Sequence, residues 1–156
     1  MPRLSWDEYF IKMAQLVATR SKDPNTHIGA VIVGPDNEVL ATGYNNFVRG
    51  IDDDVPERSE RPEKYYWFEH AERNAIYSAA RHGVSLKGCK IYLSCWIPCT
   101  DCARGIIQSG IKEIILGTQM KDASRAKWVE EAKRSEIMCQ EAGVALRYFK
   151  SPAKTS

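Results

Sequence analysis

Residues 67–75 have the sequence WFEHAERNA, and residues 97–103 have the sequence IPCTDCA. The two segments contain three side chains that commonly bind zinc, His70, Cys99 and Cys102, and a carboxylate, Glu72, two residues after the histidine. Three protein ligands of this kind leave a fourth position on zinc for water, which is typical of catalytic zinc sites. The pattern therefore predicts an open Zn²⁺ site with an acid–base group beside it.

The spacing of these residues places both segments at helix starts. Small and apolar residues recur at helical intervals after Glu69 and stop before Gly83, which predicts a helix over 69–81. Residues two apart point to different sides in mid-helix, but in a first turn both can surround an ion above the helix axis. Pro98 favours a second helix start, over 99–109, in which Cys99 and Cys102 share a face. Two helix N-termini would then point their positive ends at one metal.

Two simpler interpretations of the cysteines compete with this one. A redox pair would explain the C-x-x-C spacing but leaves His70 and Glu72 without a role. A closed structural zinc site needs a fourth ligand, for which Cys95 is the obvious candidate. Cys95 lies in a predicted strand over 89–95 on the same face as apolar residues, so core packing is favoured over ligation.

Length and composition indicate one zinc-dependent domain over residues 1–156, with 150–156 as a loose tail. The chain is 44% hydrophobic and 27% charged, and no apolar run is long enough to span a membrane. No signal-peptide pattern is present, which favours a cytoplasmic setting. Five cysteines fit reduced thiols and a metal better than disulfides, and Cys89 and Cys139 are expected in the core.

The order of the predicted elements indicates the fold class. Helices are predicted over 5–20, 69–81, 99–109 and 122–142, and strands over 28–33, 39–44, 89–95, 113–117 and 144–149. This order predicts an α/β, three-layer sandwich with a five-stranded mixed sheet covered by helices. The first two strands form an antiparallel hairpin, and the later strands are parallel.

Residues 45–64 form a long polar loop, and a stretch of this length inside a compact domain is usually functional or disordered. The loop contains the acidic run 52–54 and four cations that are candidates for binding a phosphate: Arg49, Arg58, Arg61 and Lys64. The aromatic run 65–68 follows it, and we expect it to be partly core, with a ring next to His70 as a possible stacking surface for a base.

Three further segments extend the pattern beyond the zinc ligands: SKDPNTHIGA at 21–30, TGYNNF at 42–47 and IIQSGIK at 106–112. With them, the chain resembles the cytidine deaminase superfamily, and most closely the deoxycytidylate (dCMP) deaminases. The resemblance implies the cytidine-deaminase-like form of the three-layer sandwich. The resemblance implies that His70, Cys99 and Cys102 hold Zn²⁺ and that Glu72 moves protons during hydrolysis of the base amine.

The resemblance also implies the substrate contacts and the partners. The backbone of Ala30 would contact the pyrimidine, and Asn25 would contact the sugar or the phosphate. Asn45, Trp96 and Pro98 are further candidates for binding the substrate, which is a small-molecule nucleotide. Relatives commonly assemble as dimers or hexamers, so a homo-oligomer is expected.

The chain departs from the pattern of its relatives at several positions. The segment 93–98 has one residue more than is usual, which allows a different or modified base in the pocket. Asn46 and Val48 replace the Gly and Pro that relatives often have, in a region relevant to nucleotide-triphosphate regulation. Arg73 is unusual beside Glu72 and is either an exposed helix charge or a phosphate contact.

Three functions remain open from the sequence. The favoured one is deamination of dCMP to dUMP with release of ammonia. The second is deamination of another free or modified base, or of a base in RNA or single-stranded DNA; the net charge of +2 argues against a polynucleotide channel. The third is a zinc-stabilised binding module, which would not need Glu72.

Overall fold

The computed structural model describes residues 2–118 and 126–150, and its core is a five-stranded sheet with the order β2-β1-β5-β6-β7. The strands are β1 (Gly29–Val33), β2 (Val39–Tyr44), β5 (Lys90–Leu93), β6 (Glu113–Leu116) and β7 (Ala145–Tyr148). Strand β1 pairs antiparallel with β2 and β5, whereas β5, β6 and β7 are parallel. The predicted mixed sheet is confirmed.

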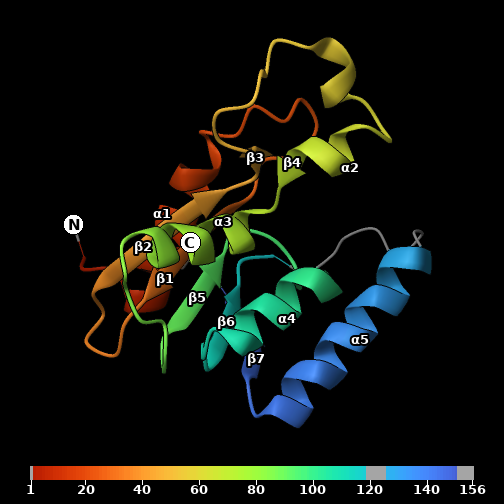
Figure 1. The fold of residues 1–156 in the computed structure, drawn as a ribbon. Helices are drawn as coiled ribbons and strands as arrows, with labels where there is room; N and C mark the ends of the chain where they lie inside the picture. Colours follow the sequence, from red (N-terminus) through yellow and green to blue (C-terminus); the bar gives the residue numbers. More distant parts are fainter. Residues whose placement is uncertain (1, 119–125, 151–156) are drawn as a thin grey trace, which may run out of the picture.

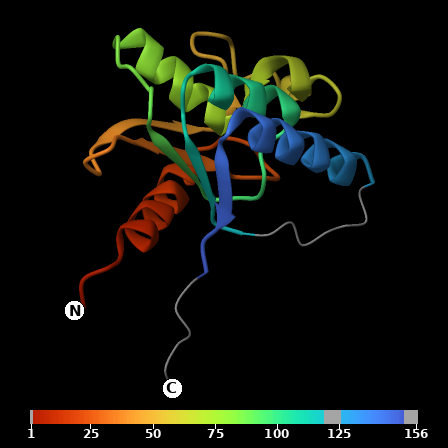
Figure 2. The same cartoon turned by 90° about the horizontal axis from the view of Figure 1, so that it is seen from below.

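Helices cover both faces of this sheet and give three layers (Figure 1; Figure 2). Helix α1 (Trp6–Ala18) lies alone on one face, and α3 (Ala71–Arg81), α4 (Thr100–Gln108) and α5 (Ala126–Ala142) lie on the other (Figure 2). The alternating sequence order of helices and strands favours this arrangement because each parallel crossover passes over a face of the sheet. The predicted three-layer α/β class is therefore confirmed.

Helix α1 begins where its capping residues predict. Ser5 is the N-cap, and its hydroxyl accepts a hydrogen bond of 3.2 Å from the backbone N–H of Glu8. On the sheet side, Phe10 and Ala14 are fully buried and pack in one cluster with Val31 and Tyr92.

The long segment after β2 contains more structure than the sequence predicts. It includes β3 (Asn46–Phe47), the 3₁₀ turn η1 (Pro56–Ser59), the short helix α2 (Lys64–Trp67) and β4 (Phe68–Glu69), with β3 and β4 paired antiparallel. The sequence signal is weak because each piece is only two to four residues long.

The aromatic run 65–68 is partly buried, which confirms the prediction that it is partly core. Tyr65 and Tyr66 are 58% and 77% exposed, respectively. Phe68 turns inward, and its ring centroid lies 4.1 Å from that of buried Phe47. Partial burial therefore falls on Trp67 and Phe68, the two residues that directly precede Glu69 and the zinc motif.

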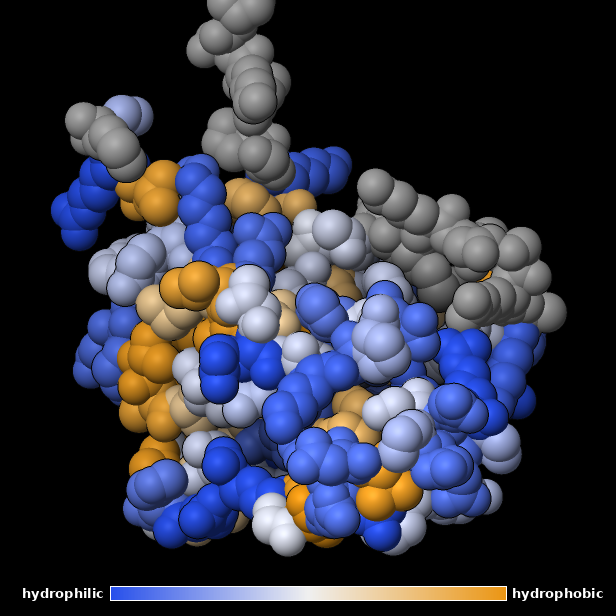
Figure 3. Space-filling view, turned by 90° about the horizontal axis from the view of Figure 1, so that it is seen from above, coloured by the Kyte–Doolittle hydropathy of each residue, from blue (hydrophilic) through white to orange (hydrophobic). Residues whose placement is uncertain are grey.

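The ends of the chain and the surface complete the description. The predicted start of the helix over 122–142 and most of the predicted tail lie outside the described residues. The face seen from above in Figure 3 carries mainly hydrophilic residues, with hydrophobic ones in separate patches. No helix within residues 2–118 and 126–150 is long and apolar enough to cross a membrane.

Candidate metal centre

His70 is the N-cap of α3, so the helix begins at Ala71 and not at Glu69 as predicted. The difference has a local cause, because Glu69 pairs with Asn46 as part of β4 and cannot at the same time be helical. The Glu69 carboxylate also accepts a hydrogen bond of 3.0 Å from the backbone N–H of His70. The extended backbone of His70 places its imidazole over the end of the helix.

Cys99 is the N-cap of α4, which begins at Thr100, one residue later than predicted. Its sulfur accepts a hydrogen bond of 3.4 Å from the backbone N–H of Cys102, so the thiol takes the place of a capping hydroxyl. The first turn of α4 therefore presents both sulfurs to the same side, as the spacing predicts.

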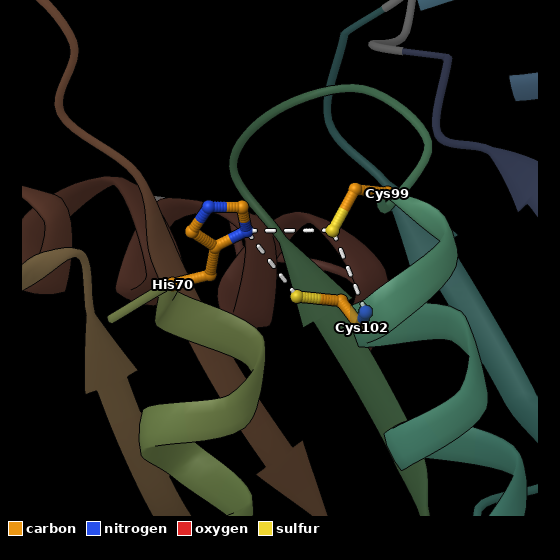
Figure 4. Close-up of side chains that lie close together, drawn as sticks. All are labelled: His70, Cys99 and Cys102. Carbon is orange, nitrogen blue, oxygen red and sulfur yellow. Dashed lines mark hydrogen bonds between the residues drawn. The ribbon is translucent and has the colours of Figure 1, made fainter. Parts of the chain in front are cut away.

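The imidazole and the two sulfurs meet at one point between the starts of α3 and α4 (Figure 4). The Nδ1 atom of His70 lies 3.5 Å from the Cys99 Sγ and 3.4 Å from the Cys102 Sγ. A tetrahedral zinc site with ordinary Zn–N and Zn–S bonds separates nitrogen and sulfur by about 3.6 Å. The donor set and its spacing therefore fit Zn²⁺.

The ionisation of each of the three donor groups depends on the other two. The hydrogen bond with the Cys102 thiol, opposed by burial and assisted by His70, lowers the pKa of Cys99 to about 4. The same hydrogen bond and burial raise the pKa of Cys102. The hydrogen bond with Cys99 raises the pKa of His70 against the effect of burial. The pair thus holds one thiolate at neutral pH, and metal binding would displace the remaining proton.

Cys95 lies outside this group of three and packs in the hydrophobic core with 6% of its surface exposed. Its thiol donates to the backbone oxygen of Trp96, and burial raises its pKa well above the usual value. This is the core packing predicted for it. Cys89 and Cys139, each 1% exposed, are also in the core as predicted.

Glu72 stands in the first turn of α3 with only 4% of its surface exposed. Within residues 2–118 and 126–150, no side chain or backbone N–H forms a hydrogen bond or ion pair with its carboxylate. Its negative charge acts on both His70 and Cys102, which places it beside the metal donors. The carboxylate is therefore not occupied by an ion pair within the described residues, as expected of a group that takes up and returns protons.

Arg73 is not an exposed helix charge, the first of the two roles considered from the sequence. Its guanidinium is partly buried and donates to the Glu69 carboxylate at 2.7 Å, and it lies 3.6 Å from the Asp101 carboxylate. Glu69 precedes His70, and Asp101 lies between the two cysteines, so Arg73 joins the two halves of the zinc motif.

Glu131 on α5 also supports the site, although the sequence analysis did not single it out. Its carboxylate accepts hydrogen bonds of 3.2 Å from both the backbone N–H and the hydroxyl of Thr100. Thr100 follows Cys99 directly, so α5 holds the first turn of α4. A glutamate 31 residues away gives no local signal, which is why sequence reasoning missed it.

Ala30, one of the predicted substrate residues, lies next to the strand that leads to the cysteines. Ala30 is fully buried and pairs with Leu93, the last residue of β5, from which the chain continues through Trp96 and Pro98 to Cys99. Pro98 is buried and Trp96 is half-buried. The structure thus brings Ala30 alongside the segment that leads to the cysteines.

Asn25 and Asn45 differ in how available their side chains are. Asn25 is exposed, whereas Asn45 is only 7% exposed. The Asn45 amide donates to the Thr26 backbone oxygen at 2.8 Å and accepts at 2.8 Å from the backbone N–H of Ile28. Its side chain therefore shapes the segment that carries Asn25.

The four candidate phosphate-binding cations are not equivalent. Lys64 is buried and its ammonium forms an ion pair of 2.8 Å with Asp23, so it is not a free loop cation. Arg58 lies 3.8 Å above the Trp67 ring and donates to the backbone oxygen of Asp52. Arg49 and Arg61 are exposed.

Comparisons with known proteins agree with this geometry. A family model for the cytidine and deoxycytidylate deaminase zinc-binding region matches residues 4–118. A deoxycytidylate deaminase of Homo sapiens is 40% identical over 151 residues, which cover 94% of this chain and 80% of the relative. An uncharacterised deaminase of Aliivibrio fischeri is 38% identical over 144 residues, covering 92% of this chain and 93% of the relative.

A solved structure has a similar fold. The dCMP deaminase from the cyanophage S-TIM5, in complex with dCMP and dUMP, superposes with a TM-score of 0.74 at 22% identity. The match covers 96% of this chain and 100% of the phage chain.

Proposed function

Because the chain belongs to the family defined by the cytidine and deoxycytidylate deaminase zinc-binding region, we propose that it hydrolyses dCMP to dUMP and ammonia. The observation that carries the proposal is the buried residue Glu72, whose carboxylate has no hydrogen bond or ion pair with the residues that the structure describes, beside three donors spaced for zinc. The similarity to the human deoxycytidylate deaminase supports the choice of substrate.

Three residues would hold the metal in this proposal: His70 through Nδ1, and Cys99 and Cys102 through their sulfurs. Zn²⁺ supplies Lewis acidity when bound, which makes water acidic enough to act as a nucleophile near neutral pH. Two thiolates and a neutral imidazole offset the charge of the ion, and the two helix starts orient the donors. A ligand at Nδ1 leaves the second imidazole nitrogen of His70 to carry the proton.

Glu72 would carry the protons in this reaction. It takes one proton from the attacking water as the water oxygen bonds to C4 of the pyrimidine, and it gives that proton to the ring nitrogen N3. It then passes the second proton of the water to the exocyclic nitrogen, the C4–N bond breaks, and ammonia leaves. Among the residues that the structure describes, no ion pair competes for the buried Glu72, which supports a role in both transfers.

The substrate contacts are part of the same proposal. The backbone of Ala30 and the segment with Trp96 and Pro98 would border the base, since Ala30 pairs with Leu93 and the chain runs from Leu93 through this segment to Cys99. Asn25 would contact the sugar or the phosphate, and Asn45 would contribute by shaping the segment before Ala30.

The test is the ratio of kcat/KM values for deoxycytidine, dCMP and a short deoxycytidine-containing oligonucleotide at fixed salt. We expect dCMP to exceed deoxycytidine by about one to two decades, the value of one charge-assisted phosphate contact. Equal rates on nucleoside and nucleotide would contradict the monophosphate assignment. Preference for the oligonucleotide would favour the base-in-polynucleotide alternative.

We also propose a single deaminase domain over 1–156, a homo-oligomeric assembly as either a dimer or a hexamer, and a cytoplasmic location. Light scattering of the zinc-loaded protein measures the assembly, and a monomer at micromolar concentration would contradict the proposed homo-oligomer. Limited proteolysis tests the single domain, and fractionation of the source cells tests the cytoplasmic location.

A further inference from the structure

Loop 21–28, which carries Asn25 and leads into β1, is organised around one buried carboxylate. The Oδ1 atom of Asp23 accepts hydrogen bonds from the backbone N–H of Asn25 at 2.8 Å and from that of Thr26 at 3.3 Å. The backbone oxygen of Asp23 bonds to the His27 ring at 2.8 Å. These contacts fix the turn on which Asn25 stands.

The other oxygen of the same carboxylate is held from outside the loop. Lys64 donates from its ammonium to Oδ2 at 2.8 Å, and the Asn45 amide lies 3.4 Å from the same atom. All three of these side chains are buried: Asp23 is 4%, Asn45 7% and Lys64 8% exposed. A buried lysine and a buried aspartate are rare unless they are paired with each other.

The charge state of Asp23 agrees with this arrangement. Burial alone would raise its pKa, but the hydrogen bonds from Lys64 and from the Asn25 N–H outweigh burial, and the pKa is lowered. The carboxylate is therefore ionised near neutral pH, and the contact with Lys64 is a full ion pair.

Lys64 begins helix α2, and α2 leads through β4 directly to His70. The ion pair thus connects the loop that carries Asn25 to the segment that carries the first zinc donor. These two parts of the chain are 41 residues apart in sequence at the points of contact.

We propose that Lys64 is a positioning residue for the substrate, which acts through Asp23 to hold Asn25 at the nucleotide relative to the zinc site. The proposal rests on the proposed function, because Asn25 is there assigned to the sugar or phosphate. Lys64 is not one of the zinc donors and its ammonium is paired with Asp23, so its loss should change how the nucleotide is held and leave the chemistry intact.

The experiment measures kcat and KM for dCMP, together with zinc content, for Lys64→Met, Asn25→Ala and the double variant. We expect Lys64→Met to raise KM about tenfold or more, with kcat and zinc content within about twofold of the parent protein. Asn25→Ala should raise KM similarly. If Lys64 acts through Asn25, the double variant should have the KM of Asn25→Ala alone.

Lys22→Met is the matched control. Lys22 lies on the same loop and pairs with Asp53 of the same long segment, but its side chain is 59% exposed. An exposed pair contributes little, so this variant should keep the parental KM within about twofold. A rise in KM equal to that of Lys64→Met would mean that the loss of any contact of this loop weakens substrate binding, and would overturn the proposal.

A second variant covers the case in which Lys64→Met leaves a buried charge unpaired and does not fold. Combining Lys64→Met with Asp23→Asn removes both charges, and the asparagine oxygen can still accept from the Asn25 N–H. We expect a folded protein with full zinc and a raised KM. A parental KM in this variant would overturn the proposal.

Two results would contradict the inference alone: additive effects in the double variant, or a fall in kcat or zinc as large as the rise in KM. An unchanged KM for Asn25→Ala would contradict the substrate contact assigned to Asn25 in the proposed function, and the inference with it. Failure of the parent protein to deaminate dCMP would overturn the proposed function, and the inference with it. Activity of the parent protein on dCMP therefore distinguishes failure of the inference from failure of the proposed function.

Discussion

Residue by residue, the metal site depends on the two sulfurs in different ways. Cys99 is the capping residue of α4 and accepts a backbone hydrogen bond, whereas Cys102 lies fully buried in the first turn. Both sulfurs lie within 3.5 Å of the same imidazole nitrogen, so each is needed to complete three donors. Replacing a sulfur by a hydroxyl removes a ligand without a large change in volume.

We therefore predict that Cys99→Ser and Cys102→Ser each lose the zinc that the parent protein carries at about one ion per chain. Metal analysis of the purified proteins measures this. Cys139→Ser and Cys95→Ser are the controls, since both thiols belong to the core. Loss of zinc from Cys95→Ser as complete as that from Cys99→Ser would mean a closed site and would contradict the catalytic interpretation.

Glu72 gives a second prediction at this scale. The change Glu72→Gln keeps the shape of the side chain but cannot take up and return a proton. We expect a loss of at least about 10²-fold in kcat for ammonia release, with zinc content and melting temperature preserved. A rate within a few fold of the parent protein would assign the proton transfers to another residue.

Among the helices and strands, the position of α3 sets the position of His70 and Glu72. Helix α3 packs closely on β2 at Gly43, where an added Cβ would lie 2.3 Å from the backbone oxygen of Ala71 and 2.4 Å from the nitrogen of Ala75. The absence of a side chain at Gly43 therefore permits the close approach of the metal helix to the sheet.

Gly43→Ala should displace α3 and with it the first zinc donor. We expect a destabilisation of about 1–3 kcal/mol, the usual cost of overpacking, and weaker zinc retention during dialysis against a chelator. Thermal unfolding and metal analysis measure the two effects.

Gly105→Ala is the control for this change. A Cβ there would lie 3.6 Å from the nearest side-chain atom, within helix α4. Alanine in a helix interior is more stable than glycine by about 0.5–1 kcal/mol, so this variant should melt at a higher temperature and keep its zinc. Equal behaviour of the two variants would contradict the role assigned to Gly43.

How much of these elements the sequence predicts depends on the range of the interactions that form them. The capping residues Ser5 and Cys99 act within three residues, and the starts of α1 and α4 are predicted to within one residue. The start of α3 is missed because Glu69 is held in β4 by Asn46, which is 23 positions earlier in the chain. The Lys64–Asp23 pair and the contact from Glu131 are also long-range, and no local periodicity indicates them.

Across the whole molecule, one network joins the first helix to the last strand. Arg147 on β7 donates to both oxygens of Asp7 on α1, at 2.7 and 3.0 Å, and to Glu113 on β6 at 2.7 Å. Tyr92 on β5 donates to Asp7 at 2.8 Å. The partners Asp7 and Arg147 are 140 residues apart, so this network fastens α1 to the sheet face opposite the zinc site.

The network makes stability depend on pH in a defined direction. The hydrogen bond from Arg147 is the main reason that the pKa of Asp7 is lowered from its ordinary value of 3.8. A group whose pKa is lower in the folded protein stabilises that protein when ionised. This contribution is fully present above the ordinary pKa, and it is lost as the pH falls through the lower pKa of the folded state.

Arg147→Met should therefore lower the melting temperature at neutral pH but not in strong acid. A partly exposed, bidentate pair contributes about 1 kcal/mol, which corresponds to a fall of about 2–4 °C for a chain of this size. Melting curves of the parent and the variant, recorded from pH 7 down through pH 3.8, should converge at the acid end as Asp7 becomes protonated in both. Lys133→Met removes an exposed pair with Glu130 and should leave the melting temperature unchanged at every pH. If the difference between parent and Arg147→Met persisted undiminished in acid, the stabilisation would come from packing of the arginine stem and not from its pairing with Asp7.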